Sequence, residues 1–282
     1  MRELPVPTLA LSPSAQPRGS LHRPSSVDGV YPAVQTHAGA GITVSWARHQ
    51  DEVRQAQRLR FNVFALEMGA RLQSPIAGHD IDSFDDYCEH LLVREVASGQ
   101  VIGTYRVLTP AQAVRAGGLY SETEFELSAV LPMRTRIAEL GRSCVHADHR
   151  QGAVILSLWG ALMGFMERNG LDVMVGCASI PMLHNGVVSI DAAASVWRQI
   201  EATHMADSAL RVYPHLALPT ARDAMLDVEP PALIKAYLRL GAKVLGAPAW
   251  DPDFNTADLP MLMRTEDLPA RYRRHFASTR MV

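Results

Sequence analysis

The order of strand and helix patterns in this sequence predicts an α/β protein with one mixed central sheet. Strand patterns at 89–96 and 101–108 are separated by only four residues, which is typical of an antiparallel hairpin. Farther along, a strand pattern at 137–145, an apolar helix at 152–169 and a second strand pattern at 171–178 form a strand–helix–strand unit. A hairpin in the first half and this unit in the second together predict a mixed sheet at the centre of one domain.

Residues 1–40 differ in composition from the rest of the chain. They are rich in Pro, Ser, Gly and Ala and show no apolar periodicity. Such a segment cannot bury enough apolar surface to offset the entropy lost on ordering. We therefore expect a disordered N-terminal tail over 1–40, followed by a folded domain over 41–282.

The first half of the domain shows three clear patterns. Alternating apolar residues predict a strand at 42–46. Asp51 is then placed to cap a helix whose apolar residues recur at helical spacing from Val53 to Leu66. A loop rich in Gly, Pro and Asp, residues 69–86, leads from this helix to the hairpin.

The second half is less regular. Residues 184–230 have no pattern that assigns an element. A helix at 232–240 is predicted to begin after two prolines and to end at Gly241. Two short strands, near 243–246 and 259–264, complete the predicted core.

Composition narrows the classes of function. The formal net charge of −2 argues against bulk electrostatic attraction to nucleic acid, so no nucleic-acid partner is expected. The three cysteines are widely spaced and form no Cys-x-x-Cys pair, which favours a reducing cytosol over disulfides or a metal site. The charge-free run at 153–166 is shorter than a membrane span, and the N-terminus has no secretion signal. We expect a cytoplasmic protein without a metal.

The most informative stretch is 137–152, in which a strand opens through a polar loop onto the start of a helix. Free backbone N–H groups and the positive end of the helix dipole at such a junction suit a phosphate. The residues expected to contact this phosphate are Val145, Arg150, Gln151, Gly152 and Ala153. The strand also carries Glu139 and Arg142, an acid and a base. Together these features indicate a transferase that uses a phosphate-bearing acyl carrier.

Several motifs resemble those of the GNAT-like acyl-homoserine-lactone synthases. The matching residues are Arg60 and Phe64 in an Arg-x-x-x-Phe pattern, Asp82 and Asp85 in the loop that follows, Arg106 in a Gly-x-x-Arg strand, Phe125, and Glu139 with Arg142 in a Glu-x-x-Arg strand. Segments 139–145, 176–179, 233–243 and 248–258 are more similar to the ornithine–acyl carrier protein N-acyltransferases of bacterial membrane-lipid synthesis. The resemblance covers roughly residues 42–265 and implies a GNAT-like acyltransferase fold.

The second resemblance implies an enzyme that moves a long, 3-hydroxylated acyl group from acyl carrier protein to the α-amino group of ornithine. The product would be lyso-ornithine lipid. It implies no bound cofactor, because the acyl donor is carried on the 4′-phosphopantetheine of the carrier protein. The usual GNAT loop ends in a small residue where this chain has Val154, which favours a carrier protein over coenzyme A. The basic residues at 271–274 leave open a contact with the carrier or with the inner membrane face.

The roles expected for Glu139 and Arg142 follow from the chemistry of an amine that attacks a thioester. The amine must be neutral to attack, and Glu139 is the candidate general base that takes its proton, through a water molecule. Arg142 would orient Glu139 or a substrate carboxylate. The alternative is a Glu139–Arg142 ion pair that only fixes the strand.

The other matching residues also have two readings each. Asp82 and Asp85 are expected to hold an ammonium group of ornithine, or else to belong to a solvated acidic loop. Arg60 and Arg106 would bind the amino-acid carboxylate or order that loop. The alternative to an acyl tunnel for Phe64 and Phe125 is an ordinary place in the core.

Two other functions fit the same motifs. One is an acyl-homoserine-lactone synthase acting on S-adenosylmethionine, against which the long segment 184–282 argues. The other is a non-catalytic module that binds acyl groups or acyl carrier protein.

Overall fold

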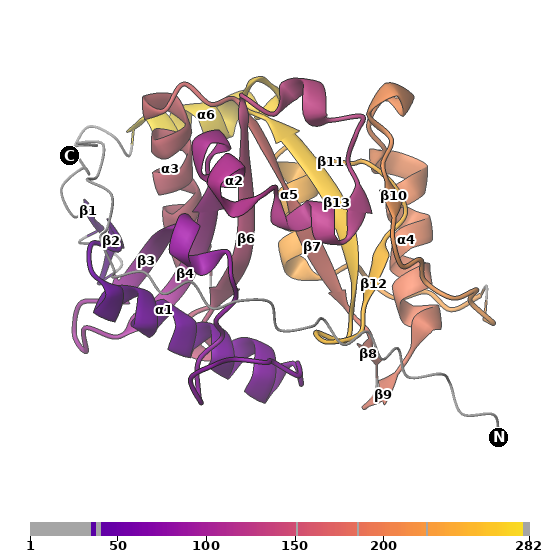
Figure 1. Cartoon of the computed structure of the whole chain (residues 1–282), viewed down its shortest axis with the longest axis horizontal. Coiled ribbons are helices and arrows are strands. Elements are labelled where there is room, and N and C mark those ends of the chain that lie inside the picture. Colours follow the sequence, from indigo (N-terminus) through magenta and orange to yellow (C-terminus); the bar gives the residue numbers. More distant parts are fainter. Residues whose placement is uncertain (1–34, 38–40, 151, 185, 224, 279–282) are drawn as a thin grey trace. The chain divides into compact units, whose positions relative to one another are not determined.

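The computed structural model describes residues 35–37, 41–150, 152–184, 186–223 and 225–278. Its centre is a nine-stranded mixed sheet with the strand order β1-β2-β3-β4-β6-β7-β13-β11, and β12 pairs with β13 (Figure 1). The strands are β1 Gln35–His37, β2 Ile42–Trp46, β3 Glu89–Glu95, β4 Val101–Leu108, β6 Ile137–Val145, β7 Val173–Pro181, β11 Lys243–Val244, β12 Ala249–Asp251 and β13 Thr256–Arg264. The predicted α/β fold with a mixed sheet is confirmed.

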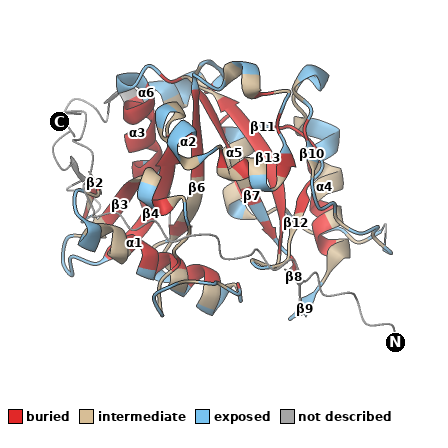
Figure 2. Cartoon of the chain, viewed as in Figure 1, coloured by how far each residue is buried: buried red, intermediate tan, exposed pale blue. Residues whose placement is uncertain are grey.

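Helices cover both faces of this sheet (Figure 1). They are α1 Gln50–Phe61, α2 Pro110–Ala116, α3 Ala153–Arg168, α4 Ile190–His204, α5 Ala232–Arg239 and α6 Ala270–Ser278. Side chains of α3, α4, α5 and α6 share one hydrophobic core, whereas α1 and α2 pack against the opposite face. The strands between these layers are largely buried (Figure 2). The result is a three-layer arrangement in which both sheet faces are covered.

The long helix α3 fixes the geometry of the sheet beneath it. Its buried residues run from Val154 to Met166, as the apolar sequence predicts. The helix lies so close to β4 that a Cβ atom on Gly103 would be 2.5 Å from Cγ1 of Val154. The absence of a side chain at this position therefore permits the close approach of helix and sheet.

The parallel strands β6 and β7 pair only at their beginnings. Ile137–Glu139 are in register with Val173–Val175, and no pairing continues beyond them in the described part of the two strands. At Gly176 an added Cβ atom would lie 2.2 Å from the carbonyl oxygen of Leu140. Past this tight contact the two strands diverge (Figure 1). The divergence opens the middle of the sheet.

A bulge in β6 lies beside this opening. Thr104 pairs with Cys144 and Arg106 with Gly141, so β6 has an extra residue opposite β4. Within the bulge Arg142 has φ +49°, a conformation that side-chain-bearing residues rarely adopt. The bulge turns the side chain of Arg142 toward the loop at 80–85, with which it forms ion pairs.

The structure changes several sequence-based assignments. His49, not Asp51, is the N-cap of α1, and Asp51 lies in the first turn, where its charge suits the helix dipole. The predicted single helix continues from α1 into a π-helical segment, Asn62–Glu67. The unassigned region contains α4, whose first turn is capped by the Ser189 side chain. Of the predicted disordered tail, 1–40, only Gln35–His37 are among the described residues, and they form a strand instead.

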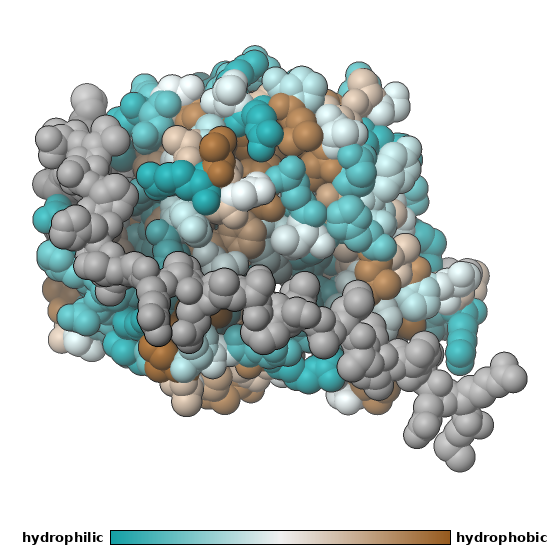
Figure 3. Space-filling view, viewed as in Figure 1, coloured by the Kyte–Doolittle hydropathy of each residue, from teal (hydrophilic) through white to brown (hydrophobic). Residues whose placement is uncertain are grey.

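None of the helices in the described part of the chain has the length and apolarity that a bilayer crossing requires. On the face shown in Figure 3, hydrophobic side chains form separate patches between hydrophilic ones.

Replacing Gly176 with Ala is expected to lower the free energy of unfolding by about 1–3 kcal/mol, because the new methyl group meets the Leu140 carbonyl. Gly141→Ala is the matched control, since a Cβ atom there meets nothing within 4 Å. Urea denaturation of both variants measures the difference. Equal stability of the two would show that β7 does not depend on this close approach.

Candidate active site

A cavity of about 790 Å³ lies where β6 and β7 diverge. Its wall is formed by β6, β7 and β13, by the turn at 120–123, and by side chains of α5 and of the π-helical segment. Apolar lining residues include Phe64, Met68, Leu140, Trp159 and Met261. The charged residues on the wall include Arg106, Glu139, Arg142, Asp251 and Asp258. An apolar cleft with a few converging charges is the usual form of a small-molecule site.

Arg60 is buried beneath this cavity, in an ion-pair network. Its Nε donates to Oδ2 of Asp80 at 2.7 Å, and its two terminal nitrogens donate to the two carboxylate oxygens of Asp85, each at 2.8 Å. Its side chain is 1% exposed, and Arg60 is not part of the cavity wall. Burial alone would raise the pKa of Asp85, but the charge and hydrogen bonds of Arg60 hold this pKa well below its ordinary value. Arg60 therefore orders the acidic loop, the second of its two predicted roles.

Asp82 connects this network to the cavity wall. Its Oδ1 accepts from Arg106 at 2.5 Å, and its Oδ2 accepts from Arg142 at 3.0 Å. Arg106 also donates to Asp85 at 3.0 Å. The predicted ammonium-holding role of Asp82 and Asp85 is thus corrected, because their oxygens bind arginines and neither residue lines the cavity.

Arg142 is held by ring faces as well as by charge. Its guanidinium carbon lies 5.0 Å from the ring centroid of Tyr120 and 4.5 Å from that of Phe254. Such cation–π contacts are favourable and restrict the side chain to one orientation. Arg142 therefore presents a fixed positive charge at the wall of the cavity.

Glu139 has partners that the sequence does not predict. It accepts hydrogen bonds from the N–H groups of Tyr120 and Ser121, at 2.6 and 2.7 Å, and from the Ser121 hydroxyl at 2.5 Å. The alternative of a Glu139–Arg142 ion pair is wrong, because Arg142 pairs with Asp80 and Asp82 instead. Burial raises the pKa of Glu139 above its ordinary value, although the hydrogen bonds act in the opposite direction. The carboxylate lies on the cavity wall.

The predicted phosphate-binding loop lies at one end of the cavity. Val145, Arg150 and Gly152 line it, Ala153 begins α3, and Gln151 lies outside the described residues. Gly152 is the N-cap of α3 and has φ +96°, which other residues rarely adopt. Arg150 donates to Glu67 at 2.6 Å and to the Val145 carbonyl at 3.1 Å. The phosphate contact itself stays a prediction.

Of the two phenylalanines predicted to line an acyl tunnel, only Phe64 does so. Phe64 forms an edge-to-face contact with Phe254 at 5.7 Å on the cavity wall. Phe125 is 1% exposed and packs in the core below α2, so its assignment to the tunnel is corrected. Sequence reasoning also missed the Tyr105 and Tyr237 hydroxyls, which lie 2.6 Å apart, both on residues that line the cavity.

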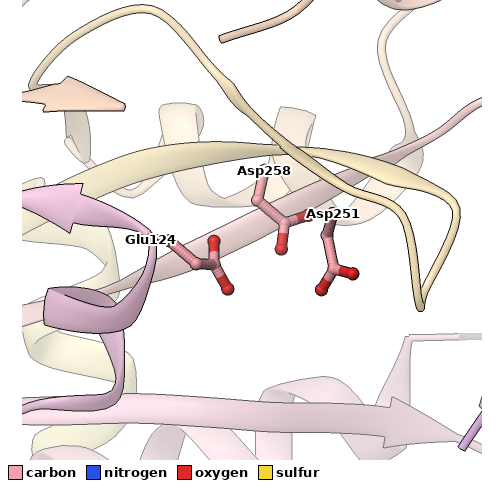
Figure 4. A group of neighbouring side chains, drawn as sticks. All are labelled: Glu124, Asp251 and Asp258. Carbon is pink, nitrogen blue, oxygen red and sulfur yellow. The ribbon is translucent and has the colours of Figure 1, made fainter. Parts of the chain in front are cut away.

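A cluster of three carboxylates beside the cavity is also absent from the sequence-based assignments. One oxygen each of Glu124, Asp251 and Asp258 lies within 4.8 Å of the other two, and the three side chains converge in Figure 4. Burial raises the pKa of Glu124 to about 9, and the charges of Asp258 and Asp251 add to this effect. The residues come from segments more than 120 positions apart, so no local spacing reveals the cluster.

The sequence is similar to those of known proteins. Residues 59–160 match the family described as Acetyltransferase (GNAT) domain. An L-ornithine N(alpha)-acyltransferase of Brucella abortus is 32% identical over 84% of this chain and 89% of that protein. Another, of Rhodobacter capsulatus, is 34% identical over 82% of this chain and 92% of that protein. The chain belongs to the L-ornithine N(alpha)-acyltransferase family.

Membership of the L-ornithine N(alpha)-acyltransferase family confirms the resemblance carried by segments 139–145, 176–179, 233–243 and 248–258. The solved structure of the acyl-homoserine-lactone synthase LasI is 15% identical, with a TM-score of 0.46, over 80% of this chain and 91% of that one. A likeness of this size says nothing about the substrate. The lactone-synthase alternative is therefore not better supported than the family reading.

Arg60→Leu is expected to lower the free energy of unfolding by about 3–5 kcal/mol, because it takes from the buried carboxylates of Asp80 and Asp85 the arginine that both share. The control is Arg136→Leu, which breaks an exposed ion pair with Asp172 and should cost far less stability, because water screens such a pair. Chemical denaturation of both variants tests the contrast. A small loss for Arg60→Leu would mean that the network does not hold the loop.

The raised pKa of Glu124 predicts a pH-dependent stability. Its stabilising contribution is fully present below the ordinary glutamate value of 4.5 and is lost as the pH rises through about 9. Glu124→Gln fixes a neutral side chain, so its melting temperature should fall less than that of the wild type between pH 6 and pH 9. Thermal melts without ligand across this range provide the measurement. Parallel curves would contradict the raised pKa.

Proposed function

We propose that this chain transfers an acyl group from acyl carrier protein to the α-amino group of L-ornithine, forming a lyso-ornithine lipid. The observation that carries the proposal is the similarity to enzymes named L-ornithine N(alpha)-acyltransferase over most of both chains. The cavity between β6 and β7 supports it, because apolar walls suit an acyl chain and the charged groups suit an amino acid.

The proposed reaction joins the α-nitrogen of the acceptor to the thioester carbonyl carbon. The carbon–sulfur bond breaks, one ammonium proton passes to a base, and a second proton from the nitrogen ends on the sulfur, which stays on the carrier as a thiol. Glu139 is the proposed base because its carboxylate lies on the cavity wall and its pKa is raised by burial. Its bonds to the turn at 120–123 fix the position of the carboxylate.

We propose that the acyl donor arrives on the 4′-phosphopantetheine of the carrier protein, with no separately bound cofactor. Beyond Glu139 the β7 side of β6 faces the cavity without a pairing strand, so its backbone groups suit the amides of an extended pantetheine arm. The start of α3 at Gly152 suits the phosphate at the end of that arm. The charge of Arg142 suits the carboxylate of the amino acid.

A cytoplasmic location and a peripheral contact with the inner membrane face also stay predictions. The basic side chains of Arg271, Arg273 and Arg274 are exposed on α6, which supports contact with an anionic partner.

The direct test is a product screen. Purified protein is incubated with 3-hydroxyacyl carrier protein and either ornithine or each of the twenty protein amino acids, and products are identified by mass spectrometry. We expect the lyso-ornithine product. Acylation of other amino acids with none of ornithine would overturn the substrate assignment, and binding of the acylated carrier without any turnover would favour a non-catalytic module.

Glu139→Gln is expected to lower kcat by about 10²-fold or more, within the range for loss of a general base. Ser121→Ala is the matched control, since it removes one hydrogen bond to Glu139 but leaves the carboxylate in place. Its kcat should fall far less. Steady-state kinetics and a melting curve on the same preparations separate chemistry from folding. Unchanged turnover in folded Glu139→Gln would leave Glu139 with only the role of holding the turn.

A further inference from the structure

Three carboxylates converge at one side of the cavity without a cation to balance them. Glu124 follows the turn at 120–123, Asp251 ends β12, and Asp258 lies in β13 (Figure 4). Asp251 and Asp258 line the cavity, and one carboxylate oxygen of Glu124 lies within 4.8 Å of theirs. No Lys or Arg within the described ranges forms an ion pair with any of the three, whereas Asp80, Asp82 and Asp85 all have arginine partners.

Buried polar groups beside the cluster also lack partners. Thr256 is 1% exposed, and its hydroxyl makes no well-formed hydrogen bond among the described residues, although it lies near enough to Asp258 to oppose the rise in the pKa of that carboxyl. Thr256 and Asp258 are two positions apart in β13, so they share one face of the strand, and both line the cavity. Asp258 is 5% exposed, and within the same described part of the chain its Oδ1 and both carboxylate oxygens of Glu124 accept no well-formed hydrogen bond. The hydroxyls of Tyr120 and Ser179 lie near these two carboxyls, but burial still raises the pKa of both. Native proteins rarely leave such groups unsatisfied, which indicates a ligand that supplies donors.

The kind of ligand that would suit the three carboxylates follows from the interactions that they do not make within the part of the protein that the structure describes. Within the described residues the cluster lacks an ion-pair partner and well-formed hydrogen bonds from donors, and it offers acceptors from three directions. A primary ammonium group has one positive charge and three N–H donors, so it can bond to all three carboxylates at once. The carboxylate of Asp251 has a fixed position, because its Oδ1 accepts from the N–H groups of Asp253 and Phe254 at 2.8 and 2.9 Å.

We propose that Glu124, Asp251 and Asp258 bind the side-chain ammonium of the amino-acid acceptor. The inference rests on the proposed function, in which the acceptor is ornithine and only its α-amine is acylated. Carboxylates around the δ-ammonium raise its pKa and keep it protonated, so it cannot attack a thioester. The α-amine has the lower intrinsic pKa and stays free to lose its proton. The cluster therefore selects a diamino acid and also decides which of its two nitrogens reacts.

The test compares ornithine with norvaline, which has the same carbon skeleton without the δ-ammonium. Asp251→Asn and Asp258→Asn each remove one charge with little change in shape. Each should lower kcat/KM for ornithine about 10- to 100-fold, the range for losing a charge-assisted hydrogen bond, while the smaller kcat/KM for norvaline stays unchanged. The control is Asp253→Asn, an exposed side chain two residues from Asp251, which should affect neither substrate.

A second readout does not depend on turnover. In thermal melts without acyl donor, ornithine should stabilise the wild type more than norvaline does, and this difference should shrink in Asp258→Asn. The melting temperature of the unliganded variant should not fall, because a buried unpaired carboxylate has been neutralised, so misfolding is not expected to obscure the result.

Other outcomes overturn the proposal. Equal losses for ornithine and norvaline would show that the cluster acts on a group that both substrates share. Loss of activity after treatment with EDTA, restored by a divalent cation, would assign the cluster to a metal. If ornithine neither binds nor is acylated, the proposed function itself is wrong, and this inference falls with it. If ornithine is acylated normally by both variants, only the inference is wrong.

Discussion

The site depends on the buried pairing of Arg60 with Asp80 and Asp85. Arg60 comes from α1, and the aspartates come from the loop that follows it, so the pairing ties an irregular segment to a rigid helix. Asp82 then lies where it can accept from Arg106 on β4 and from Arg142 on β6. Charges of both signs are therefore paired out of water, and each partner fixes the next. This framework and the rings of Tyr120 and Phe254 together fix the orientation of Arg142 at the cavity.

The divergence of β6 and β7 creates the cavity, and different parts of its wall carry apolar and charged side chains. Apolar residues such as Phe64 and Trp159 suit a hydrocarbon chain, whereas Glu139 and Arg142 place opposite charges on the strand at the opening. Asp258 adds a second negative region on β13. A ligand that is apolar at one end and carries both an acid and an amine at the other would match these apolar and charged parts of the wall. This match between ligand and cavity depends on residues from several elements, so no single sequence motif reveals it.

Much of the framework can be predicted from the sequence, because the determining signals are local. The hairpin of β3 and β4 and the apolar helix α3 follow from periodicity and length. The site is less predictable. Sequence reasoning places Asp82 and Asp85 in one acidic loop, but their partners are arginines supplied by α1, β4 and β6. Glu124 cannot be associated with Asp258 in this way, since the two are far apart in the sequence and meet only when the turn at 120–123 packs beside β13.

The short pairing between β6 and β7, three residues on each strand, also affects how the chain folds. Strands β1 to β4 and β6 form one antiparallel block, whereas β7, β11, β12 and β13 form another, and only three residues on each side join the blocks. Inside the first block β1–β2 and β3–β4 close short loops, whereas residues 47–88 separate β2 from β3. The junction requires the crossover at 146–172, and inside the second block residues 182–255 separate β7 from β13. Such non-local closures are slow compared with hairpin formation, so the hairpin of β3 and β4 can form before the longer pairings on either side of the junction.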